Sequence, residues 1–224
     1  MDKTAVKQVE EYVRETMKEM ANHHDFKHVD RVRNWALQIA ESEGVEEKEL
    51  VEIAALMHDI GLPYVEDRKY HGEKGAEVAG RFLRENNLLP EEQIIRVTDA
   101  IGNHTRMKKD SSQLLDILQD ADRLEAMGAV GIMRAFTSKS SWQDYNPDNI
   151  KGAMWGKCGE KYQGAFFPKP EENTIIDQIN LQIHYYDNLN TETARRLAEP
   201  LVEYMKDFIL QLEDEVLSGR EVEK

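Results

Sequence analysis

The chain has 224 residues, of which 40% are apolar and 32% are charged, a length and balance typical of one sizeable soluble domain. Its formal net charge is −14, with 43 acidic and 29 basic side chains, so we expect no binding to nucleic acid or to an anionic membrane. The single cysteine, Cys158, excludes an intramolecular disulfide and an all-thiolate metal site. No stretch approaches the roughly 18 apolar residues of a membrane span, and we therefore expect a cytoplasmic protein.

Apolar residues recur at helical spacing along almost the whole chain, which predicts an all-α fold. Small residues at spacings of three and four over 72–83 would also let another helix approach closely. The apolar stripes cover residues 6–20, 29–40, 50–57, 94–101 and 115–118.

The stretch AALMHDIG, residues 54–61, places His58 and Asp59 side by side at the end of an apolar helix. Burying an unpaired carboxylate costs several kcal/mol, because the charge loses its hydration. Asp59 therefore needs a hydrogen-bonded partner or a cation.

Other ionisable residues also fall on apolar helix faces. His28 lies next to the second stripe, His71 begins the small-residue segment, and His104 and Asp122 follow later stripes. Neutral imidazoles and carboxylates suit first-row divalent metals. A histidine on an apolar face is, however, also typical of a hydrogen-bonded core residue, and Asp122 could pair with Arg123. Spacing alone leaves a metal centre and a set of satisfied core residues as equal alternatives.

The helical pattern stops over 138–173, where three prolines, four glycines and six aromatic residues occur together. A loop of this length in a compact domain is uncommon and usually functional. It could be a lid whose aromatic rings stack on a base, or it could cover the core. Regular helix resumes over 174–218, and the amphipathic C-terminal helix could pack within the domain or across a homodimer interface. The aromatic candidates are Trp142, Tyr145, Trp155, Tyr162 and Phe166.

The ordered set of His28, His58 with Asp59, and Asp122 within DADRLEA resembles the signature of the HD-domain metal-dependent phosphohydrolases. The segments HVDRVRNWA, HGEKGAEVAGRFL, IGNHTR and NTETAR agree with it, and the chain is most similar to small bacterial HD-domain nucleotide pyrophosphohydrolases. The resemblance implies an all-helical core in which these four residues ligate one divalent metal per chain. It also implies that Asp59 would be the bridging ligand if a second metal binds. Manganese is the frequent choice in this family, with iron, magnesium, cobalt, nickel or zinc as alternatives.

His71 and His104 stand in the order of two further histidines that occur in binuclear branches of the superfamily. We expect both to act as catalytic residues by stabilising charge that develops on the substrate phosphate, while Asp59 accepts the proton of the attacking water. A second metal bound at this histidine pair is the alternative.

Three basic residues near the proposed ligands, Arg31, Lys74 and Lys108, are candidates for binding substrate phosphate. A solvated helix face explains them equally well. His23 and His24 lie in the polar run ANHHDFKH, and we expect both to be exposed.

These patterns predict a single domain over 1–224, with its HD core at 20–137 and additional helices at 174–218. The predicted function is metal-dependent hydrolysis of a phosphoanhydride bond in a nucleotide, converting a nucleoside triphosphate to monophosphate and pyrophosphate. The partner would be this small-molecule nucleotide or another phosphate ester. Alternatives are a 5′-nucleotidase, which hydrolyses a phosphomonoester, and a di-iron oxygenase of the same superfamily. A catalytically silent ligand-binding module is a further alternative, which metal-dependent turnover would eliminate.

Overall fold

The computed structural model describes residues 4–20, 24–106, 111–156 and 173–218. These residues form helices and turns with two isolated bridges and no β-strand, which confirms the all-α prediction for the described part. No helix in these ranges is both long and apolar enough to cross a membrane. The chain divides into two compact units, 1–122 and 123–224. The prediction of one domain over the whole chain stays a prediction.

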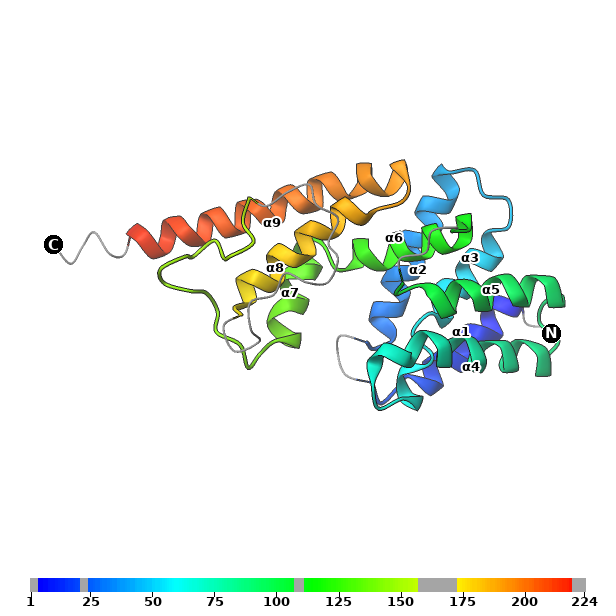
Figure 1. Cartoon of the computed structure of the whole chain (residues 1–224). Helices are drawn as coiled ribbons and strands as arrows, with labels where there is room; N and C mark the ends of the chain where they lie inside the picture. Colours follow the sequence, from blue (N-terminus) through cyan, green and yellow to red (C-terminus); the bar gives the residue numbers. More distant parts are fainter. Residues whose placement is uncertain (1–3, 21–23, 107–110, 157–172, 219–224) are drawn as a thin grey trace. The chain divides into compact units, whose positions relative to one another are not determined.

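The first unit is a bundle of helices joined by short connections (Figure 1). Two 3-10 turns, η1 (Leu62–Tyr64) and η2 (Arg68–Tyr70), lie between its third and fourth α-helices. The α-helices are α1 (Ala5–Thr16), α2 (Phe26–Ser42), α3 (Lys48–Met57), α4 (His71–Glu85), α5 (Glu91–Asn103) and α6 (Gln113–Glu125).

Helix α3 is the centre of this unit and contacts α1, α2 and α5. Its side chains from Ile53 to Met57 are fully buried, which explains its nearly continuous apolar sequence. Burying each large aliphatic side chain contributes about 1.5–3 kcal/mol. Arg33 on α2 reinforces the contacts by donating to Glu52 on α3 at 2.8 Å and to Glu10 on α1 at 3.1 Å.

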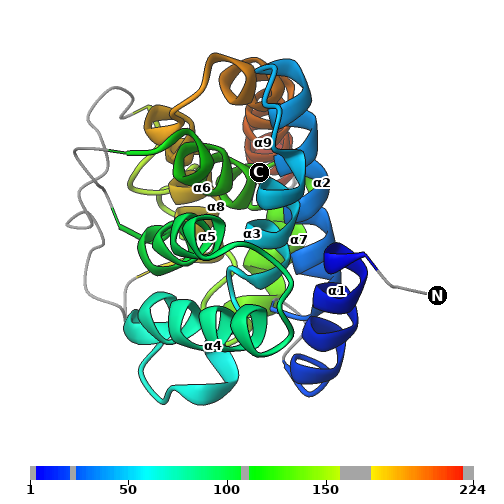
Figure 2. The same ribbon diagram turned by 90° about the vertical axis from the view of Figure 1, so that its right-hand side faces the viewer.

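Helices α4 and α5 lie side by side (Figure 2), where the small-residue segment predicted a close helix contact. A Cβ atom on Gly72 would stand 3.1 Å from the carbonyl oxygen of Gly102. The two helix backbones therefore meet almost without side chains between them, and this brings the start of α4 beside the end of α5.

The second unit contains α7 (Gly128–Ser138), α8 (Ile175–His184), the 3-10 turn η4 (Tyr185–Asn188) and α9 (Glu192–Ser218). Helix α8 contacts both α7 and α9, and α9 continues without interruption through Pro200. Thr174 begins α8 in a capping box with Asp177, which satisfies backbone amides that the first helical turn leaves free.

The described part of the predicted loop, 139–156, is attached to α8. Asp177 accepts a hydrogen bond from the amide of Ala153 at 2.8 Å, and Asn180 donates to the carbonyl of Lys151 at 2.8 Å. This part of the loop therefore has defined contacts with a helix of its own unit. Residues 157–172, which include Cys158, Tyr162 and Phe166, lie outside the described residues.

Candidate metal centre

The candidate ligands lie at helix ends in the first unit. His58 and His104 cap the C-termini of α3 and α5, and His71 is the first residue of α4. The carbonyl groups at a helix C-terminus carry partial negative charge, so two such ends favour a cation between them. Asp59 follows His58 directly and is 3% exposed.

Gly61 allows the turn after α3 to lie against the start of α4. A Cβ atom at this position would stand 2.1 Å from the carbonyl oxygen of His71 and 2.4 Å from the amide nitrogen of Gly75. Both distances are far inside van der Waals contact, so a larger residue would force the backbones apart. The glycine in the HDIG stretch thus brings His71 within reach of Asp59.

Asp59 divides its two carboxylate oxygens between two pairs of histidines. Its Oδ2 lies 3.4 Å from Nε2 of His28 and 3.5 Å from Nε2 of His58. Its Oδ1 lies 3.3 Å from Nε2 of His71 and 3.8 Å from Nε2 of His104. This is the arrangement of a carboxylate that can bridge two cations.

Within each pair the two Nε2 atoms lie 3.1 Å apart, between His28 and His58 and between His71 and His104. Nδ1 of His58 donates to the carbonyl of Ala55 at 2.8 Å, and Nδ1 of His104 donates to that of Ile101 at 2.7 Å.

Nδ1 of His71 donates in the same way, to the carbonyl of Arg68. When Nδ1 carries the only proton of each ring, the Nε2 lone pairs of His71 and His104 face each other, and a proton or a metal ion between them would satisfy both. Ligand nitrogens about 2.1 Å from one ion at cis or tetrahedral angles stand about 3.0–3.4 Å apart, so the spacing fits a shared metal ion.

The protonation states also suit a metal. Burial lowers the pKa of His58 to about 4, which keeps its imidazole neutral. Burial alone would raise the pKa of Asp59, but His58 and hydrogen bonds from His104, His24 and His28 hold it well below its usual range. Burial also opposes charge on His71, yet the Asp59 carboxylate raises the pKa of this imidazole. The cluster thus offers a neutral His58 imidazole and an ionised Asp59 carboxylate, and it attracts positive charge.

Asp122 completes the first histidine pair from α6. Its Oδ1 lies 3.7 Å from Nε2 of His28 and 3.9 Å from Nε2 of His58, and its side chain is 36% exposed. All six sequence-predicted residues therefore converge. Ligand atoms within 4.8 Å of one another form the groups His24–His28–Asp59, His28–His58–Asp122 and Asp59–His71–His104.

His24 is a member of this cluster that the sequence did not indicate. The prediction that it is exposed is wrong, because its side chain is 14% exposed and its Nδ1 donates to Oδ2 of Asp59 at 2.8 Å. The residue precedes the N-cap of α2, Asp25, so no helical periodicity applies to it. The only signal was its spacing of four residues before His28. His23 lies outside the described residues.

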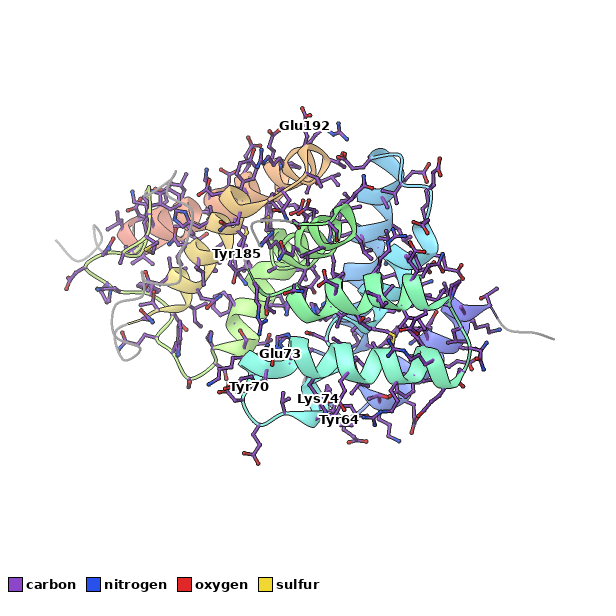
Figure 3. All side chains as sticks on the ribbon, turned by 45° about the vertical axis from the view of Figure 1, so that its right-hand side comes forward. Tyr64, Tyr70, Glu73, Lys74, Tyr185 and Glu192 are labelled. Carbon is purple, nitrogen blue, oxygen red and sulfur yellow. The ribbon has the colours of Figure 1, made fainter. Side chains whose placement is uncertain are left out.

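The predicted phosphate-binding residues remain predictions. Arg31 is partly buried on α2, three residues after His28, and Lys74 follows His71 by the same interval on α4. Lys74 pairs with Glu77 at 2.8 Å, and Figure 3 shows it on the first turns of α4. Lys108 lies outside the described residues.

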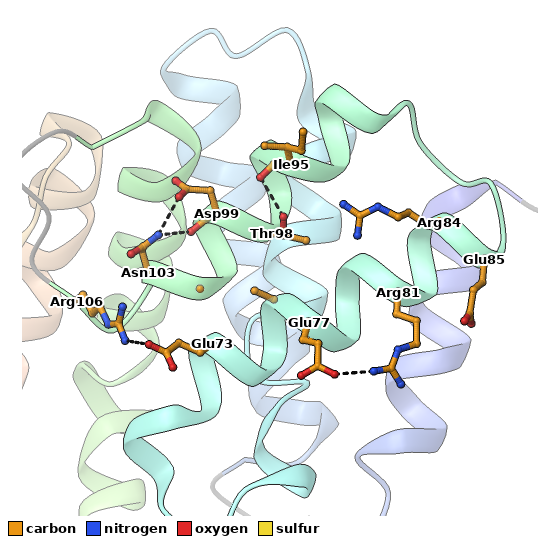
Figure 4. Close-up of a pocket in the computed structure, with 12 residues that line it drawn as sticks. Glu73, Glu77, Arg81, Arg84, Glu85, Ile95, Thr98, Asp99, Asn103 and Arg106 are labelled. Carbon is orange, nitrogen blue, oxygen red and sulfur yellow. Dashed lines mark hydrogen bonds and ion pairs between the residues drawn. The ribbon is translucent and has the colours of Figure 1, made fainter.

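A separate groove of about 860 Å³ runs along the outer surface of α4 and α5 (Figure 4). Each of its three arginines pairs with a carboxylate: Arg81 with Glu77 at 2.6 Å, Arg84 with Glu91 at 2.6 Å, and Arg106 with Glu73. This internal pairing makes the groove less suitable than the histidine cluster for an anionic phosphate.

Comparison with known proteins finds an HD domain in the first part of the chain. Residues 25–127 match the HD domain, a range that contains all six predicted site residues. The chain is 28% identical over 221 residues to the uncharacterized protein YpgQ of Bacillus subtilis, covering 93% of this chain and 92% of YpgQ. The crystal structure of YpgQ in complex with ADP has a TM-score of 0.69 at 26% identity and covers 94% of both chains.

Two other solved structures that are similar to this chain are of proteins described as HD-superfamily hydrolases. A predicted HD-superfamily hydrolase from an uncultured Thermotogales bacterium has a TM-score of 0.66 at 27% identity, covering 95% of this chain and 93% of its own. An HD-superfamily hydrolase from Bacillus thuringiensis has a TM-score of 0.65 at 26% identity, covering 94% and 95%. Family match, fold and ligand cluster agree: residues 25–127 form an HD domain, and similarity to HD-superfamily hydrolases over most of the chain supports the HD-domain superfamily of metal-dependent phosphohydrolases.

Proposed function

We propose that this protein hydrolyses a phosphoanhydride bond in a nucleotide, converting a nucleoside triphosphate to a monophosphate and pyrophosphate. The observation that carries the proposal is the division of the Asp59 oxygens between two histidine pairs. With divalent metal bound, such a site would concentrate cationic charge in a buried cluster, and phosphoryl transfer depends mainly on positioning and charge stabilisation.

The nucleotide part of the proposal is supported by a relative. YpgQ, which has the same fold over 94% of both chains, was crystallised in complex with ADP. The net charge of −14 would repel a free nucleotide, so its phosphates need a strong local cation.

In this proposal His28, His58, Asp59 and Asp122 hold one divalent ion, with manganese as the expected metal. A divalent ion bound there would polarise a phosphoryl oxygen and lower the pKa of its bound water toward neutrality. Oδ1 of Asp59 is left to serve the second histidine pair.

His71 and His104 have two alternative roles in this proposal. In either role they would help to bind an anionic substrate. With Oδ1 of Asp59 they would hold a second cation, because the carbonyls that accept from Nδ1 turn the Nε2 atom of each ring toward the other ring and toward Asp59. Alternatively, one of them would hold a proton and donate it in a hydrogen bond to a phosphoryl oxygen. Arg31, Lys74 and Lys108 would then contact the remaining phosphates.

The test is a manganese-reconstituted assay against nucleoside mono-, di- and triphosphates that separates monophosphate, pyrophosphate and orthophosphate. Running it in H₂¹⁸O shows whether water attacks the α- or the β-phosphorus. Asp59→Ala should abolish turnover, whereas Asp148→Ala, which removes an exposed carboxylate in the second unit, should not. Pyrophosphate that appears without metal, or that persists in Asp59→Ala, would contradict the proposal.

The six-residue cluster also favours a second candidate, the di-iron oxygenase, because two histidine pairs bridged by one carboxylate suit two metals. The same preparation distinguishes the two functions. Two tightly held irons per chain together with oxygen consumption, and no nucleotide turnover, would favour the oxygenase. Orthophosphate released from monophosphates alone would favour the 5′-nucleotidase.

A further inference from the structure

A chain of hydrogen bonds reaches the buried carboxylate from the surface. Arg68 is exposed on the turn η2, and its Nη2 contacts Nε2 of His24. His24 in turn contacts Oδ2 of Asp59 through Nδ1 at 2.8 Å. His24 lies one residue before the range that matches the HD domain.

The chemistry of these contacts fixes which nitrogen of His24 carries its proton. A guanidinium group can only donate hydrogen bonds, so Nε2 of His24 must accept from Arg68. The remaining proton is then on Nδ1, which donates to the Asp59 carboxylate. Arg68 therefore selects the tautomer of His24 that can hold Asp59.

The same residue also orients the other side of the cluster. The backbone carbonyl of Arg68 accepts the hydrogen bond from Nδ1 of His71. His71 in turn presents Nε2 to Oδ1 of Asp59 at 3.3 Å. Arg68 thus acts on both oxygens of the carboxylate, on Oδ2 through its side chain and on Oδ1 through its main chain.

We propose that His24, held in one tautomer by Arg68, is a positioning residue that fixes the rotation of the Asp59 carboxylate so that each oxygen faces one histidine pair. The inference rests on the metal-binding part of the proposed function. It does not depend on which substrate is hydrolysed.

The contact of His24 with Oδ2, at 2.8 Å, is shorter than those of His28 and His58, at 3.4 and 3.5 Å, so among these three contacts it holds the plane of the carboxylate most firmly. Hydrogen-bond partners that orient a metal-binding side chain typically contribute about 10- to 100-fold in metal affinity. We therefore expect loss of the His24 donor to weaken manganese binding by this factor, with little effect on the helical core.

The experiment measures manganese affinity of the metal-free protein by titration calorimetry, without substrate. His24→Phe keeps a flat ring but removes the donor, and it should weaken binding about 10- to 100-fold. His24→Asn places an amide N–H near the position of Nδ1 and should restore affinity to within about threefold of wild type. Thermal unfolding of the metal-free variants shows whether the fold is intact.

Arg68 provides a second variant that cannot be mistaken for a folding defect, because its side chain is exposed. Arg68→Gln should weaken manganese binding in the same direction as His24→Phe. Lys69→Gln removes the same charge one residue further on, where Lys69 pairs with Asp67 at 2.7 Å, and should leave the affinity unchanged.

Several results would overturn the proposal. If His24→Asn binds manganese as weakly as His28→Asn, then His24 is itself a ligand. If Arg68→Gln raises the KM for nucleotide but leaves metal affinity intact, Arg68 contacts the substrate instead. Unchanged affinity in His24→Phe would show that Asp59 needs no such support. A failure of nucleotide hydrolysis with these affinity changes intact would refute only the proposed function.

Discussion

Replacing Gly61 with alanine would separate the turn after α3 from the start of α4. The new Cβ would stand 2.1 Å from the carbonyl oxygen of His71, whereas ordinary contact begins at 3.4 Å, so the backbones must move apart by about 1.3 Å. The clash involves main-chain atoms, which cannot rotate out of the way. Overpacking of this kind costs about 1–3 kcal/mol, and occasionally more. We expect about 3 kcal/mol, a fall in melting temperature of roughly 10 °C.

The displacement should also damage the metal centre, because His71 would move away from Asp59. Metal–ligand distances tolerate only about 0.2 Å, so a shift near 1 Å should weaken manganese binding at least about tenfold. Thermal unfolding followed by circular dichroism measures the first effect on metal-free protein, and titration calorimetry measures the second.

Gly102→Ala is the matched control, since it also replaces glycine with alanine, but within helix α5. Its Cβ would meet only the Cβ of Ala76, at an ordinary 3.4 Å. Alanine is about 1 kcal/mol better than glycine inside a helix, so this variant should be as stable as wild type or more so. If Gly61→Ala melts within about 1 °C of Gly102→Ala and binds manganese normally, the packing argument is wrong.

Three other changes have defined outcomes. Because the pKa of His58 is lowered to about 4, its contribution to metal-free stability is complete above pH 6.5 and is lost between pH 6.5 and about 4. The loss in free energy of unfolding is on the order of 3 kcal/mol. His58→Gln should therefore flatten the plot of melting temperature against pH between these two values, and an unchanged slope would contradict this prediction. Arg33→Met should lower stability to urea by about 1 kcal/mol, since it unpairs the partly buried Glu52; an unshifted midpoint would argue against this. Asp177→Ala should cost up to about 2 kcal/mol and speed proteolysis within 139–156, because Ala153 loses its acceptor; equal cleavage rates would refute this.

Much of the fold follows from the sequence pattern. The stripe over 50–57 coincides with the buried helix α3, and the small-residue segment at 72–83 lies within α4, which packs closely on α5. These features are predictable because helical periodicity reports directly which face of a helix is apolar. The loop prediction agrees for residues 139–156, which form only turns and isolated bridges.

The candidate site was predictable to the level of residue identity. Asp59 was conspicuous because a carboxylate in an apolar run needs compensation, and the four histidines and Asp122 do converge with it. His24 was missed because it precedes the N-cap of α2, where neither periodicity nor burial can be inferred from neighbours. Arg68 gave no signal for the same reason, since it lies on a turn.

By itself the sequence determined which histidine and aspartate side chains lie on apolar helix faces, although such polar groups normally prefer water. That pattern predicted a cluster of imidazoles and carboxylates. Only the tertiary structure decided how the cluster is divided. The 3.3 and 3.4 Å approaches of His71 and His28 to opposite oxygens of Asp59 depend on the distances between helix ends and on one side-chain rotation. Sequence periodicity describes the face of each helix separately. It contains no measure of how closely Gly61 lets two backbones meet, and that approach brings the two histidine pairs to one carboxylate.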